Sequence, residues 1–135
     1  LNSVTITGAD GDGCIVSGAG SSVTASDCVF SNCRGDGICL IEGAQARLTN
    51  CKLVANFNNG ARVSDAVTCA YMQCCSFQEN AGVGIVVTDA TVYTSDCSYE
   101  GQSKATRMTS KASLGTPTRM MIVDLPQGLT DTTSQ

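Results

Sequence analysis

A segment of about 23 to 24 residues repeats four times along this chain and keeps its glycines, cysteines and apolar positions in step. The four copies begin at Val4, Cys28, Cys51 and Cys75, and a fifth copy fades after Cys97. Periods of about 20 to 50 residues are typical of stacked solenoids, in which each unit buries its apolar face only against its neighbours. The period therefore constrains the shape of the chain more than any other feature.

Each repeat contains three short stretches in which apolar residues alternate with a period of two, as in strands. The first series is Val4–Ile6, Cys28–Phe30, Cys51–Leu53, Cys75–Phe77 and Cys97–Tyr99. The second series is Cys14–Val16, Ile38–Leu40, Ala61–Val63 and Ile85–Val87. The third series is Val23–Ala25, Ala46–Leu48, Ala70–Met72 and Val92–Thr94. We expect the two end residues of each stretch to face inward and the middle residue to face outward.

Strands this short are stable only if each one pairs with its equivalent in the next repeat. The sequence therefore predicts an all-β fold, a parallel β-helix of about four to five coils with three strands in each coil. Two corner patterns accompany the strands. Asn32, Asn56 and Asn80 are expected to stack as an amide ladder, and a small-residue corner is expected at Ala19, Ala44, Ala66 and Ala90.

The chain resembles the right-handed parallel β-helix repeats (PbH1-type) of the pectin-lyase-like superfamily. The likeness rests on a Cys-x-Phe/Leu-x-x-Asn, Gly-x-Gly-Ile and Ala-corner pattern in Cys28–Ala44, Cys51–Ala66 and Cys75–Ala90. This resemblance implies a right-handed, single-stranded solenoid. It implies no single activity, because the superfamily includes polysaccharide lyases and hydrolases as well as non-catalytic scaffold and recognition modules.

The repeat pattern predicts two regions in the chain. Residues 1–101 form the β-helix repeats, and residues 102–135 form an extended C-terminal tail rich in Ser and Thr. One apolar island, Met120–Leu125, interrupts this tail. We expect the tail to dock either on the solenoid or on a partner chain.

The composition limits which cellular compartments and which classes of partner we expect. Nine cysteines would suit a secreted disulfide framework, but five of them occupy core positions of the repeat, where free Cys acts as a small apolar residue. We therefore expect reduced thiols and an intracellular, cytoplasmic setting, with an extracellular one as the alternative. Sparse charge and a net charge of −4 disfavour nucleic acid, and the apolar runs are too short to span a membrane.

The sequence offers little for catalysis. It has no His, which removes the most common general base. Asp65 and Asp89 are the best candidates for a catalytic pair, one coil apart, and could share a proton or a Ca²⁺ ion. The adjacent coil is expected to offer Gly43 rather than a third carboxylate, so the cluster is incomplete. Cys33, Cys39, Cys69 and Cys74 are the surface thiols expected, but they lack metal-site spacing.

Two outer faces are better candidates for binding. The third series projects Thr24, Arg47, Tyr71 and Tyr93 on successive coils, which forms a flat aromatic and cationic platform. The second series projects Ile15, Cys39, Arg62 and Val86, an unusually apolar face. We expect that face to be covered by the tail through Met120, Met121, Ile122 and Leu125.

These observations favour a non-enzymatic β-helix that acts as a structural or interaction module, with no resident cofactor. It would be a subunit or fragment of a larger protein assembly, and a cytoskeletal or ciliary complex is one such setting. The first alternative is a carbohydrate-binding or polysaccharide lyase or hydrolase-like fragment that uses Asp65 and Asp89. The second alternative is a domain that recognises a peptide along the tyrosine stripe.

Overall fold

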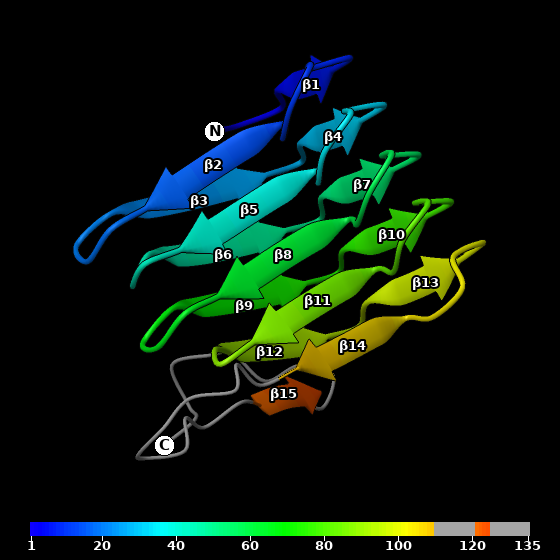
Figure 1. Cartoon of the computed structure of the whole chain (residues 1–135). Coiled ribbons are helices and arrows are strands. Elements are labelled where there is room, and N and C mark those ends of the chain that lie inside the picture. Colours follow the sequence, from blue (N-terminus) through cyan, green and yellow to red (C-terminus); the bar gives the residue numbers. More distant parts are fainter. Residues whose placement is uncertain (110–120, 125–135) are drawn as a thin grey trace.

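The computed structural model describes residues 1–109 and 121–124, and the side chains of residues 1–106. The described residues coil into a solenoid in which each turn stacks directly on the one before it (Figure 1). Three parallel five-stranded sheets run along the stack. The predicted all-β solenoid with three strands in each coil is confirmed.

The first sheet contains β1 (Thr5–Thr7), β4 (Val29–Ser31), β7 (Lys52–Val54), β10 (Ser76–Gln78) and β13 (Ser98–Glu100). The second sheet contains β2 (Cys14–Ser17), β5 (Ile38–Ile41), β8 (Ala61–Ser64), β11 (Ile85–Thr88) and β14 (Thr106–Thr109). The third sheet contains β3 (Ser22–Ser26), β6 (Gln45–Thr49), β9 (Cys69–Gln73), β12 (Thr91–Ser95) and β15 (Met121–Asp124). No helix long and apolar enough to cross a membrane occurs among the residues described.

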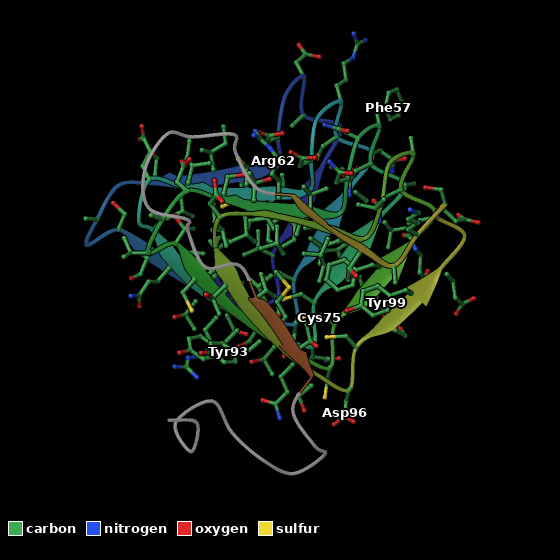
Figure 2. The ribbon with its side chains drawn as sticks, turned by 60° about the horizontal axis from the view of Figure 1, so that its bottom comes forward. Phe57, Arg62, Cys75, Tyr93, Asp96 and Tyr99 are labelled. Atoms are coloured by element: carbon green, nitrogen blue, oxygen red, sulfur yellow. The ribbon has the colours of Figure 1, made fainter. Side chains whose placement is uncertain are left out.

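A narrow apolar core fills the space between the three sheets. The inward positions of the internal coils are almost fully excluded from solvent, as the alternation predicts: Phe30, Ile38, Leu40, Leu48, Leu53, Val63, Met72, Phe77, Ile85 and Val87. The rings of Phe77 and Tyr99 stack with centroids 5.2 Å apart. Figure 2 shows Cys75 inside this column and Tyr93 on its outer side. Burial along the axis therefore continues from coil to coil without a break.

Cysteines form one file of this core, immediately before the first sheet. Cys28, Cys51 and Cys75 are buried and lie on successive coils, since the amides of Lys52, Ser76 and Ser98 donate to their carbonyl groups. The buried thiols also satisfy main-chain acceptors: the Cys51 thiol donates to Thr49 O at 3.4 Å, and that of Cys75 donates to Gln73 O at 3.4 Å. These thiols therefore act as core packing and as corner hydrogen-bond donors.

The corners depend on a left-handed backbone conformation that most residues avoid. Three columns of residues adopt it, with φ between 54° and 105° in every coil. The residues that precede the first sheet are Ser3, Asp27, Asn50, Cys74 and Asp96. Those that follow it are Gly8, Asn32, Ala55, Glu79 and Gly101, and those that follow the second sheet are Gly18, Glu42, Asp65 and Asp89. The coil geometry fixes these corners, whichever residue occupies them.

The amide ladder exists, but one predicted member is wrong. The Asn56 side chain donates to Asn80 Oδ1 at 2.9 Å, and its own Oδ1 accepts the Cys33 amide at 3.1 Å. Both side chains are nearly fully buried. The position equivalent to Asn56 in the preceding coil is therefore Cys33. Asn32 lies one residue earlier, in the left-handed column, where Asn is favoured for its backbone rather than for its side chain.

The predicted alanine corner is also only partly correct. Gln45 N bonds Ser21 O and Cys69 N bonds Ala44 O, which places Ser21, Ala44 and Thr68 at equivalent positions. Ala90 shares this position, because Thr91 N bonds Thr68 O. Ala19 and Ala66 lie outside this column because their corners are longer than the other two. The corner lengths vary while the strands stay in register.

Strands continue beyond Gly101, where the sequence pattern places the end of the repeats. β14 pairs in parallel with β11, and β15 pairs with β12. Thr106-Arg-Met-Thr has a single apolar residue, so its sequence gives no strand signal of the kind seen in the earlier coils. Met120 and Leu125 fall outside the described residues.

Close contact between coils predicts that glycine is required at some corners and not at others. A Cβ atom on Gly60 would lie 2.7 Å from Gly84 O and 2.8 Å from Phe77 Cδ2, whereas a Cβ on Gly11 would meet nothing within 4 Å. We expect Gly60→Ala to lower the free energy of unfolding by about 1–3 kcal/mol. Gly11→Ala should change it by less than about 0.5 kcal/mol. Urea unfolding of both variants tests this, and equal stabilities would contradict the packing.

Candidate functional site

The outer face of the third sheet carries the predicted aromatic column. Register pairs Thr24 with Arg47, Arg47 with Tyr71 and Tyr71 with Tyr93. The two tyrosine rings are stacked, with centroids 4.8 Å apart and an interplanar angle of 9°. The Arg47 guanidinium carbon lies 5.3 Å from the centroid of the Tyr71 ring. The predicted column is thus assembled by the sheet, with a cation at one end and π faces along it.

The surroundings of this column are polar and nearly uncharged. The flanking outward positions carry hydroxyl, amide or thiol groups: Ser22, Gln45, Cys69, Thr91, Ser26, Thr49 and Gln73. Strands β3, β6, β9 and β12, all of which are described, contain no carboxylate. Arg47 is exposed and both tyrosines are half-buried, so the platform is accessible and held by its neighbours. Such a surface suits a ligand that offers flat contact area and hydrogen bonds.

The outer face of the second sheet carries Ile15, Cys39, Arg62 and Val86 in register, as predicted. Ile15 is 58% exposed, while Cys39 and Val86 are buried. Figure 2 shows Arg62 on this face, away from Tyr93.

The predicted cover of this face by the tail is wrong for the segment that the structure describes. Met121–Asp124 forms β15 and pairs with β12 at the edge of the third sheet. An edge strand presents unpaired main-chain groups, and this short apolar segment satisfies them by pairing.

A partly buried ion pair joins the corner before the second sheet to one of its strands. Asp36 is 1% exposed, and its Oδ2 accepts a hydrogen bond from Arg62 Nε at 2.9 Å. Its Oδ1 accepts the main-chain and side-chain N–H groups of Asn59 at 2.9 and 3.0 Å. The Asp36 amide in turn donates to Asp12 Oδ1 at 2.6 Å. The repeat pattern of the sequence did not indicate this pair, which joins a corner to the strand of the next coil.

Asp12, Asp36 and Cys39 place their ligand atoms within 4.8 Å of one another. Both oxygens of Asp36 are already occupied by Arg62 and Asn59. Burial raises the pKa of the Cys39 thiol to about 11 despite the neighbouring Arg62, so the thiol is protonated at neutral pH. The cluster is therefore a satisfied ion-pair network rather than an open metal site.

The acidic corner contains one more carboxylate than the sequence indicated. Asp65 and Asp89 are on successive coils, as predicted, because Ser64 pairs with Thr88 directly before them. The preceding coil contributes Glu42 at this position and not Gly43, since the Glu42 amide donates to Asp65 Oδ2 at 3.0 Å. Asp89 is 6% exposed, Asp65 is half-buried and Glu42 is exposed. Three carboxylates thus lie on successive coils, directly after the strands of the second sheet.

The cysteines are less exposed than their predicted role as surface thiols requires. Cys33 and Cys39 are buried, Cys69 is half-buried and Cys74 is exposed. All nine cysteines are free thiols in the structure. Hydrogen bonding to the Cys51 and Cys97 thiols, together with burial, raises the pKa of Cys75. The Cys75 thiol is thus a poor nucleophile, because the thiolate is the reactive form.

The ion pair gives a stability prediction. Arg62→Ala leaves the Asp36 carboxylate buried without its cation, and we expect a loss of about 2–3 kcal/mol, less than for a fully buried pair because Arg62 is partly exposed. In an Asp36→Asn background the same change should cost less than about 1 kcal/mol. Arg34→Ala is the control, since its pair with Asp10 is exposed. Equal costs in the two backgrounds, measured by denaturant unfolding, would contradict the assignment.

Comparison with known proteins identifies the fold and the family of the chain. No curated protein matches the sequence. Among solved structures, the crystal structure of the periplasmic alginate epimerase AlgG superposes with a TM-score of 0.56 at 10% sequence identity, over 85% of this chain. The match spans 36% of the epimerase chain, so it shows a shared fold. The family described as the right handed beta helix region matches residues 1–115. The chain therefore belongs to the right-handed β-helix family.

Proposed function

We propose that this β-helix is a non-catalytic interaction module of a larger protein assembly. The partner would bind to the outer face of the third sheet. The observation that carries this proposal is the column of Arg47, Tyr71 and Tyr93, whose rings stack at 4.8 Å on a rigid sheet. Tyr and Arg are enriched among the residues that dominate protein interfaces. Rings already fixed by stacking lose little conformational entropy when a partner binds.

The rest of the molecule supports a scaffold role. The buried thiols of the core file serve packing and main-chain hydrogen bonds, and Asp36 and Arg62 neutralise each other. These groups hold coils together and leave few side chains for proton transfer. We place the module in a reducing compartment, where buried thiols persist without pairing.

A tagged chain expressed in its native source tests this function. We expect Tyr71→Ala with Tyr93→Ala to reduce recovery of the bound protein at least tenfold, since a hot-spot Tyr contributes about 2 kcal/mol or more. Phe57→Ala removes a 65% exposed aromatic side chain from a different part of the surface and is the matched control. Quantitative mass spectrometry of the co-purified protein provides the measurement. Equal recovery by all variants would remove the third sheet as the binding face.

The acidic corner favours a second candidate, action on an acidic polysaccharide. Glu42, Asp65 and Asp89 form a column of carboxylates, and the structural neighbour is an alginate epimerase. A polyanion would approach these groups only if a proton or a Ca²⁺ ion offset the repulsion between like charges. The proposed acid–base pair is Asp65 with Asp89.

Incubation with alginate and polygalacturonate, with and without Ca²⁺, separates the two candidates. The interaction-module account predicts no change in the polymer by proton NMR or by absorbance of unsaturated products. Turnover that Asp65→Asn abolishes and Asp10→Asn preserves would establish the second candidate and overturn the first. Asp10 is a suitable control because its carboxylate is 98% exposed. It precedes the second sheet, whereas the acidic corner follows the strands of that sheet.

A further inference from the structure

A hollow of about 300 Å³ lies at the corner where the third sheet passes into the first. It is lined by Asp27, Cys28, Val29, Asn50 and Lys52. The corner backbone places its polar groups, because Asp27 and Asn50 occupy the left-handed column with φ of 57° and 54°. Figure 2 labels Asp96, a later member of the same column, at this corner of the coil. The hollow is independent of both candidate sites described above.

Two opposite charges line this hollow without neutralising each other. Asn50 Nδ2 donates to Asp27 Oδ1 at 2.6 Å, which holds the carboxylate in place. Lys52 lies on the adjacent coil, since its amide donates to Cys28 O. Among the described residues Lys52 forms no ion pair, although the Asp27 carboxylate lines the same hollow. The space between these side chains therefore has an anionic and a cationic side.

The polar atoms that remain available define a ligand. Asp27 Oδ2 and Asn50 Oδ1 are hydrogen-bond acceptors, and the Lys52 ammonium is a donor. The Cys28 thiol is directed to Ser26 O at 3.3 Å, and Val29 provides an apolar wall. A ligand that matches this arrangement has a positive group for the acceptors, a negative group for the lysine and a small apolar body. The volume lies at the lower end of the range for small-molecule sites.

We propose that this corner hollow binds a small zwitterion of the α-amino acid type. Its ammonium group contacts Asp27 and Asn50, and its carboxylate contacts Lys52. The Asn50–Asp27 hydrogen bond orients the anionic side before the ligand arrives, so binding does not need to order that carboxylate. Both charges of the ligand are required, because either one alone leaves the opposite side of the hollow without a partner.

Titration of ¹⁵N-labelled protein with glycine at low ionic strength tests the proposal, since salt screens an open site. We expect saturable shifts of the Asn50 side-chain amide. Glycinamide, which lacks the carboxylate, and acetate, which lacks the amine, should bind at least tenfold more weakly. Equal responses to the three probes, or no saturable shift with glycine, would overturn the proposal.

Four neutralising variants complete the test. Asp27→Asn and Lys52→Met should each weaken glycine binding at least tenfold while the spectrum stays that of the folded protein. Asn suits the left-handed backbone at position 27, so the first variant removes the charge and keeps the corner. Asp96→Asn, in the same column, and Lys104→Met, near the other end of the stack, are the matched controls and should bind as the wild type does. Unchanged affinity in Asp27→Asn and Lys52→Met would contradict the assigned contacts.

Discussion

Parallel main-chain hydrogen bonding between equivalent strands of successive coils is the interaction on which this structure depends. The strands are three to five residues long, and none could form a stable element alone. Register pairs Phe30 with Leu53 and Leu53 with Phe77, so each core side chain lies directly on the equivalent one. A slip of one residue would turn every inward side chain outward. Apolar burial and hydrogen bonding therefore select the same alignment.

The corners maintain this alignment, and they also create the surfaces available for binding. Residues with left-handed backbones bend the chain at the same positions in each coil, and buried Asn and Asp side chains join adjacent corners. Regular strands between fixed corners present outward residues in straight columns. The stacked Tyr71 and Tyr93 rings, the carboxylates from Glu42 to Asp89, and the hollow beside Asn50 all result from this repetition. The surfaces that this chain offers for binding are thus built from columns of residues on successive coils rather than from single residues.

The strands and their outward columns could be predicted because alternation with a period of two holds within each strand. Arg47, Tyr71 and Tyr93 lie near the centres of strands of equal length, so counting along the sequence placed them correctly. The corners could not be predicted in this way, because their lengths differ from coil to coil. Asn32 shares a residue type with Asn56 but not a position, and Glu42 occupies the place that counting gave to Gly43.

Two further features could not be predicted from the sequence, for a related reason. The pairing of Asp36 with Arg62 crosses from a corner to the strand of the next coil, so no periodicity within one repeat reveals it. β14 is recognised by its pairing with β11 and not by its composition. In both cases the structure depends on contacts with the neighbouring coil. A pattern read along the sequence does not show those contacts. The outward face of a solenoid is therefore easier to predict than its corners.

Sulfur positions in a crystal offer the most direct measurement of the stacked register. Anomalous scattering locates sulfur atoms without reference to an assumed chain trace. The account predicts that the peaks of Cys28, Cys51, Cys75 and Cys97 form one file along the axis, with the spacing of about 4.8 Å that separates adjacent strands. Peaks for these four residues that are dispersed across the molecule would contradict the coil alignment, and with it every surface derived from that alignment.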